Sequence, residues 1–389
     1  MKQLFETSEI NGMILKNRFI RSATWEGMAT REGMCTPRLI ELVKNLAKGE
    51  IGLIVSSSAY VQEKGRAVPT GLLIDDDQYI SGLKKMVDAV HAEGVPIVGQ
   101  IGHVGLYADP RVTHDNRPFA PSVVPTSQYR LWLKLAHFDD IPETFFEAMT
   151  HHDIQGVVEA YGEAANRVKK AGFDGVQIHA CHGYLLNQFL GLVYNKREDE
   201  YGGTLDNRSR FLLEVVKHVR ERIGNSYPMM IKMNCRDFME GGPEIDDYCR
   251  VAEMLEEAGI DAIEVTGGTF SSGSRNRASR RKILTEEQEA YFRREASAIK
   301  KRVGKPVILT GGIRSFHIAE QIVADNEADY IGICRPFIRE PDLIKRWKSG
   351  DHTKAACVSE NLCAVEAAKG NGIYCVVEKR EREKESQTS

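Results

Sequence analysis

Short apolar segments that alternate with helical stretches constrain this chain more than any other feature. Eight such segments recur, and most are unbroken runs of Val, Ile and Leu without polar alternation. Runs of this kind are typical of parallel strands that are covered on both faces. The segments are 19–24, 51–56, 95–101, 173–179, 228–234, 260–266, 306–310 and 329–334.

The stretches between these segments carry helical spacing, and several end in a glycine directly before the next strand, as at Gly94, Gly172 and Gly259. Glycine suits the left-handed position that closes a helix. The repeated order of strand, loop, helix and glycine predicts an α/β chain that closes into a (β/α)8 TIM barrel. We expect the barrel to span residues 1–347 and a cysteine-containing C-terminal extension to span 348–389.

Three additions to the barrel are predicted. Asn11-Gly12 lies between apolar residues, which indicates an N-terminal β-hairpin that plugs the barrel bottom. Long loops follow the third strand (103–156) and the sixth strand (267–291), on the face where barrels place their active sites. The charged end, 378–389, is expected to be a disordered tail.

Composition excludes several classes of protein. A net charge of -3 gives no electrostatic basis for binding nucleic acid. Glu6 and Glu9 interrupt any signal peptide, and no stretch is long and apolar enough to span a membrane, so a cytoplasmic protein is expected. Eight cysteines in a chain of this length do not indicate a disulfide framework.

The segment richest in chemistry is HACHGYLLNQFL, 179–190, which begins where the fourth strand ends. His179 and His182 could both donate a hydrogen bond to one ligand oxygen, and the Tyr184 hydroxyl could pass on a proton. Paired histidines with Cys181 between them also resemble metal ligands, or could be purely structural. Because no further ligand stands at a recognisable spacing, we predict no metal site.

This segment, followed by YNKREDEYGGTLDNRSRF (194–211), resembles the signature of the Old Yellow Enzyme family of FMN-dependent NAD(P)H oxidoreductases. Further blocks match in the family's order: NRFIRSAT (17–24), GQIGHVG (99–105), IKMN (231–234), LTGGIR (309–314) and GICRPFIREP (332–341). The resemblance covers about residues 1–347.

The resemblance implies how the chain would hold the flavin ring. Gln100 would bond the pyrimidine edge, and Lys232 would sit near N1, where positive charge stabilises the reduced flavin. Residues that line the ring would be Ser22, Ala23, Thr24 and Ser58. The phosphate would be held by Gly311, Gly312, Cys334 and Arg335, which fits the phosphate site that barrels build from their last two loops.

Three positions depart from the family pattern. Trp25 stands where relatives carry Thr or Cys close to the flavin, so it would shape the substrate site. Leu106 replaces an Arg, and Cys334 replaces a small residue.

The C-terminal extension raises the question of an iron–sulfur cluster. Some relatives continue through a four-cysteine cluster motif into further domains, for which this chain ends too soon. Here only Cys357, Cys363 and Cys375 remain, and Glu360 stands at the place of a further cysteine. A cluster normally needs four thiolates, so none is predicted.

The resemblance implies an ene-reductase that uses NADH or NADPH to reduce an electron-poor alkene, namely an unsaturated carbonyl compound, enoyl thioester or nitroalkene. The alternatives are an FMN-dependent oxidative demethylase or dehydrogenase, an electron-transfer subunit for a protein partner, and a flavin-free barrel lyase. The sequence leaves the oligomeric state open, and a homo-oligomer is one possibility.

A basic run lies in the loop after the sixth strand. Its cations could capture an anionic group of NADPH or of a coenzyme A thioester, or could be a solvated surface. They are Arg275, Arg277, Arg280, Arg281 and Lys282.

Overall fold

The computed structural model describes residues 3–109, 111–112, 117–124, 146–273 and 275–388. Its centre is a closed barrel of eight parallel strands, in which β14 pairs with β3 to complete the ring. The barrel strands are β3 (Phe19–Arg21), β4 (Leu53–Val55), β7 (Ile97–Gly102), β10 (Gly175–Ala180), β11 (Met229–Asn234), β12 (Ala262–Thr266), β13 (Val307–Thr310) and β14 (Tyr330–Ile333). Each lies within one of the predicted segments or within a residue of it, so the predicted (β/α)8 fold is confirmed.

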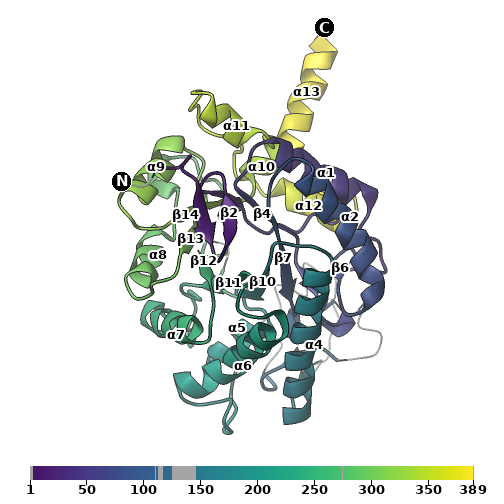
Figure 1. The fold of residues 1–389 in the computed structure, drawn as a ribbon, viewed down its shortest axis with the longest axis vertical. Coiled ribbons are helices and arrows are strands. Elements are labelled where there is room, and N and C mark those ends of the chain that lie inside the picture. The colour runs from purple at the N-terminus through teal and green to yellow at the C-terminus, as the bar shows by residue number, and fades with distance from the viewer. Residues whose placement is uncertain (1–2, 110, 113–116, 125–145, 274, 389) are drawn as a thin grey trace.

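Helices surround the strands in the order that the sequence pattern predicts (Figure 1). They are α1 (Pro37–Lys48), α2 (Ile80–His91), α4 (His151–Lys170), α6 (Leu205–Ile223), α7 (Ile245–Glu257), α8 (Arg293–Lys300), α9 (Phe316–Ala324) and α11 (Leu343–Lys348).

Local sequence explains where these helices begin and end. Thr36 caps α1 with Pro37 at the first helical position, and Thr150 forms a capping box with Asp153 at the start of α4. Gly94, Gly172 and Gly259 adopt positive φ before their strands, as predicted.

The predicted N-terminal hairpin is confirmed. Strands β1 (Ser8–Ile10) and β2 (Met13–Leu15) pair antiparallel, and Asn11 and Gly12 both adopt positive φ, as a tight two-residue turn requires. Ile10, Met13 and Leu15 are buried against inward-facing residues of the barrel strands. The hairpin therefore plugs the barrel.

The C-terminal extension corrects one expectation. Residues 378–389 were expected to be a disordered tail, whereas a helix, α13 (Val376–Thr388), projects from the barrel there (Figure 1). Two contacts explain its order: Arg382 pairs with Glu378 one turn away, and Arg339 pairs with Glu381 at 2.7 Å. A second helix, α12 (Leu362–Ala368), precedes it.

Within the described part of the chain, no helix is both long enough and apolar enough to cross a membrane. All eight cysteines are free thiols.

Candidate active site

The predicted site residues lie at or near the carboxyl ends of the barrel strands. This placement puts them on one face, because parallel strands all end on the same side. Ser22, Gln100, His179 and Lys232 are buried. Gly311 is buried as well, and the remaining predicted residues are half-buried: Ala23, Thr24, Trp25, Ser58, Gly312, Cys334, Arg335, His182 and Tyr184.

A chain of hydrogen bonds crosses the barrel interior beneath this face. The Gln100 amide donates to Gln177 Oε1 at 2.7 Å, and Gln177 donates to Glu264 at 2.9 Å. Lys232 Nζ lies 2.9 Å from Glu264 Oε1 and 2.6 Å from Ser22 Oγ. Five of the predicted strand segments thus present polar groups to one another inside the barrel.

Lys232 and Glu264 form a fully buried ion pair. Burial alone would lower the pKa of Lys232, but the adjacent carboxylate holds that pKa above its ordinary value. Burial would likewise raise the pKa of Glu264, but Lys232 and the hydrogen bonds from Ser22 and Gln177 hold that pKa below its ordinary value. Both groups therefore stay charged. A ligand above them would meet the Lys232 ammonium, whose positive charge the Glu264 carboxylate largely balances.

Glu264 and Gln177 belong to this hydrogen-bond chain, although no sequence motif marks them. The sequence does carry a signal for them, because each is a polar residue in the middle of a largely apolar strand, AIEVT and GVQIHA. Such a residue needs a buried partner.

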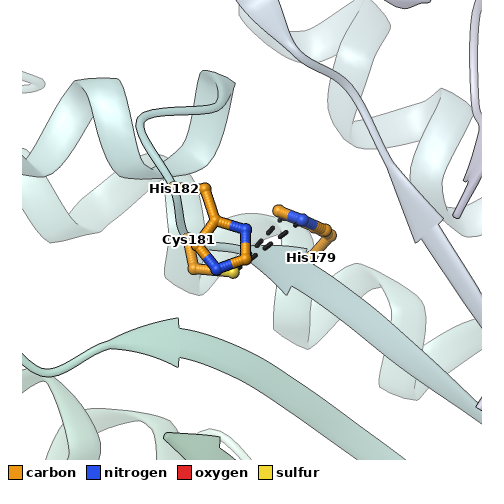
Figure 2. Close-up of side chains that lie close together, drawn as sticks. All are labelled: His179, Cys181 and His182. Carbon is orange, nitrogen blue, oxygen red and sulfur yellow. Dashed lines mark hydrogen bonds between the residues drawn. The ribbon is translucent and has the colours of Figure 1, made fainter. Parts of the chain in front are cut away.

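The three predicted catalytic side chains converge where β10 ends. The His179 ring centre lies 4.6 Å from that of Tyr184 and 5.3 Å from that of His182. Figure 2 shows the two imidazoles lying close together with Cys181 beside them. A short helix, α5 (Leu185–Leu190), begins directly after Tyr184.

A strained turn presents His182. Its φ of 61° is unusual for a residue with a side chain, and buried amides support it. Asn234 Oδ1 accepts from the His182 N–H at 3.1 Å, and Asn187 Oδ1 accepts from the Gly183 N–H at 2.6 Å. Thr266 Oγ1 lies 3.1 Å from His182 Nε2 and fixes the ring.

Burial sets the protonation state of all three side chains. It lowers the pKa of His179 to about 3, with a further contribution from Lys232, and lowers the pKa of His182 well below its ordinary value. Burial also raises the pKa of Tyr184 well above its ordinary value. At neutral pH the site therefore holds two neutral imidazoles and a protonated phenol, which are all hydrogen-bond donors.

Ligand atoms of His179, Cys181 and His182 lie within 4.8 Å of one another, close enough to share a metal ion. Cys181 Sγ is nearly equidistant from His179 Nδ1 and Nε2, at 3.7 and 3.8 Å. Burial raises the pKa of Cys181 well above its ordinary value, which opposes the thiolate that a metal ion would bind. That the site binds no metal stays a prediction.

The predicted phosphate site offers free donors. Within the described chain, the backbone N–H groups of Gly311 and Gly312 donate to no protein acceptor. Arg335 donates to the Arg280 carbonyl at 2.8 Å and to Asn361 Oδ1 at 2.5 Å. A Cβ on Gly312 would come within 2.5 Å of the Tyr291 ring, so glycine is required there.

These residues fit FMN. Beneath the active-site face, Gln100 and Lys232 would supply N–H donors for the flavin ring. At the ends of β13 and β14, the backbone N–H groups of two glycines and the Arg335 guanidinium would supply donors for the phosphate. Ser58 lies near His179, because a Cβ on Gly102 would approach both side chains. Trp25 Nε1 is buried without a partner in the described chain, an orphan donor at the predicted ring site.

The extension holds three cysteines where an iron–sulfur cluster normally needs four thiolates, and that no cluster forms stays a prediction. Cys357, Cys363 and Cys375 are half-buried, and Glu360 is exposed. Burial raises the pKa of Cys363 and Cys375, which opposes thiolate formation.

The barrel, its buried donors and the His, His and Tyr cluster fit the class of flavin-binding oxidoreductase barrels. Comparison with known proteins gives the family. Residues 3–354 match the model of the NADH:flavin oxidoreductase / NADH oxidase family, and the chain belongs to it.

Relatives and a solved structure agree with this assignment. An NADH oxidase from Thermoanaerobacter brockii is 33% identical over 92% of this chain and 53% of its own length. An NADPH dehydrogenase from Halalkalibacterium halodurans is 31% identical over 87% of this chain and 92% of its own. A 2-naphthoyl-CoA reductase complex superposes with a TM-score of 0.85, at 27% identity, over 96% of this chain and 56% of that one. The chain thus spans about half the length of some proteins it matches.

Replacing Arg335 with Ala should weaken FMN binding about 10- to 100-fold, because a charge-assisted contact to phosphate is worth about 1.5 to 3 kcal/mol. Fluorescence titration of the apoprotein with FMN measures the change. Asn361→Gly is the matched control, because it breaks the Arg335–Asn361 contact and keeps the charge. Equal loss of affinity in both variants would show that Arg335 acts through the extension and not on the phosphate.

Proposed function

We propose that the protein reduces the C=C bond of an α,β-unsaturated carbonyl compound, an enoyl thioester or a nitroalkene, with NADH or NADPH as hydride donor. The observation that carries the proposal is the convergence of His179, His182 and Tyr184 above the buried Gln100 and Lys232. The structural likeness to a reductase of a coenzyme A thioester supports including enoyl thioesters.

The bound FMN would take hydride from NAD(P)H and pass it to the alkene. The flavin ring would be oriented by Gln100, Lys232, Ser22, Ala23, Thr24 and Ser58. Its phosphate would be anchored by Gly311, Gly312, Cys334 and Arg335.

His179 and His182 would bind the substrate oxygen. Two N–H donors on one oxygen polarise the alkene and gain strength as negative charge develops on that oxygen. Because burial keeps both rings neutral, they can do this without a net charge that would also bind unreactive anions.

Tyr184 would deliver the proton to the α carbon. Its raised pKa keeps the hydroxyl protonated at neutral pH, and within the described chain that hydroxyl donates to no protein acceptor. Phe270 stacks near the Tyr184 ring, with centroids 6.1 Å apart, and Trp25 is partly buried, so apolar surface is available for the rest of the substrate.

Anaerobic stopped-flow spectroscopy tests the proposal. NAD(P)H should bleach the flavin rapidly, and an alkene from a panel of enones, enoyl thioesters and nitroalkenes should restore its colour with formation of the saturated product. If an oxidisable substrate such as an amine bleaches the flavin rapidly and NAD(P)H does not, the protein is instead the dehydrogenase of the first alternative. If NAD(P)H bleaches the flavin and only a protein partner restores its colour, the protein is an electron-transfer subunit.

A further inference from the structure

The loop after β12 forms a basic pocket beside the active-site face. The pocket has a volume of about 630 Å3, which is within the range of small-molecule sites. Its lining is Arg275, Arg280, Arg281, Lys282, Ile283, Glu287, Gln288 and Tyr291. We call the first four residues the pocket cations.

Contacts to the rest of the protein hold this loop in place. The Lys282 N–H donates to the Ser359 carbonyl at 3.0 Å, and Asn361 donates to the Ser279 carbonyl at 2.9 Å. The Tyr291 hydroxyl donates to the Ala278 carbonyl at 2.6 Å. The pocket is therefore preorganised by the barrel and the extension together.

The pocket cations have no acidic partners within the described chain. By contrast, two arginines near the ends of α8 are paired, Arg293 with Glu327 and Arg302 with Glu253. Glu287 is the one acid of the lining. Four cations against one carboxylate leave the pocket strongly positive.

Arg280 is the fixed member of the set. Its guanidinium lies 4.4 Å from the Tyr291 ring centre and 5.2 Å from that of Phe292. Its Nε is buried and has no partner in the described chain. A stacked guanidinium with free N–H groups is suited to bind phosphate in a two-pronged contact.

Tyr291 separates this pocket from the predicted site of the FMN phosphate. One side of its ring packs on Gly311 and Gly312, and the residue also lines the pocket. Neither glycine nor Arg335 belongs to the lining. The pocket therefore adjoins the predicted phosphate site, where Arg335 donates to the Arg280 carbonyl, but has its own set of cations.

We propose that the basic pocket binds the phosphorylated adenosine end of a ligand whose reactive end lies over the flavin. The shared chemistry is a ribose phosphate, carried either by a coenzyme A thioester substrate or by NADPH. A neutral enone would not use it. The inference rests on the proposed function for its active-site end, but the pocket itself binds without turnover.

The test uses the FMN-loaded protein and the double variant Arg275→Ala/Arg281→Ala, because both side chains are exposed. The control is Lys85→Ala/Lys217→Ala, which removes the same charge from exposed positions on α2 and α6. Calorimetry with adenosine 3′,5′-bisphosphate and adenosine 2′,5′-bisphosphate measures binding directly. We expect at least tenfold weaker, salt-sensitive binding of one of them in the pocket variant only.

Kinetics then identify the source of the phosphate. If it belongs to the substrate, the half-saturation constant should rise for crotonyl-CoA and stay unchanged for the crotonyl thioester of N-acetylcysteamine and for cyclohexenone. If it belongs to the hydride donor, the rise should appear for NADPH and not for NADH. Loss of FMN from the pocket variant, or equal weakening in the control, would overturn the proposal. Failure of every alkene with intact bisphosphate binding would reject the proposed reaction and keep the pocket.

Discussion

Replacing Tyr184 with Phe should slow alkene reduction by about 10²- to 10⁴-fold and leave reduction of FMN by NAD(P)H near the wild-type rate. The reason is that the hydroxyl has a proton to deliver in only one half of the cycle. The substitution removes one oxygen and keeps the aromatic ring that packs 4.6 Å from His179, so the site should stay assembled.

The nature of the substrate sharpens this expectation. Nitroalkenes should suffer least, because their carbanion can survive until water protonates it, whereas simple enones should suffer most. Anaerobic single-turnover kinetics on both half-reactions supply the measurement. If both halves slow equally, or neither slows, Tyr184 is not the acid, and the proton comes from water or from a residue of the loops after β7 and β12.

Most of the architecture could be predicted from the sequence, for a physical reason. A parallel strand covered on both faces is largely apolar, so the segments that became β4 and β14 were visible as apolar runs. The Asn11-Gly12 turn was visible too, because few other pairs tolerate its backbone. The helix α13 could not be predicted. A charged segment is expected to be solvated and disordered unless its partner in the fold, here Arg339, is known.

The site was predictable only where a motif carries the chemistry. His179, His182 and Tyr184 are neighbours in sequence, and the structure brings their rings together. Glu264 is remote from Lys232 in the chain, and only the pairing of β11 with β12, which sets Lys232 opposite Glu264, reveals the ion pair. The same holds for Asn234 and Asn187, whose support of the His182 turn depends on loop geometry that no spacing rule contains.

Replacing His182 or His179 with Ala should slow alkene reduction for every substrate, by about 10²- to 10³-fold for each donor removed. Each donor stabilises the charge that develops on the substrate oxygen during hydride transfer, before any proton reaches carbon. Its loss therefore slows the hydride-transfer step. Nitroalkenes should therefore suffer as much as enones, which separates these variants from Tyr184→Phe. Reduction of FMN should change much less.

Conservative variants and pH test whether N–H donation is what these residues supply. His182→Asn and His179→Asn keep a donor and should recover part of the lost rate. Because burial lowers the pKa of His179 to about 3, its ring is neutral above that pH and becomes charged only below it. The wild-type rate of alkene reduction should accordingly show no limb from this histidine between about pH 5 and 8. A limb near pH 6.5 that disappears in His179→Asn would contradict a neutral donor, and would mean that the charged imidazolium binds the substrate.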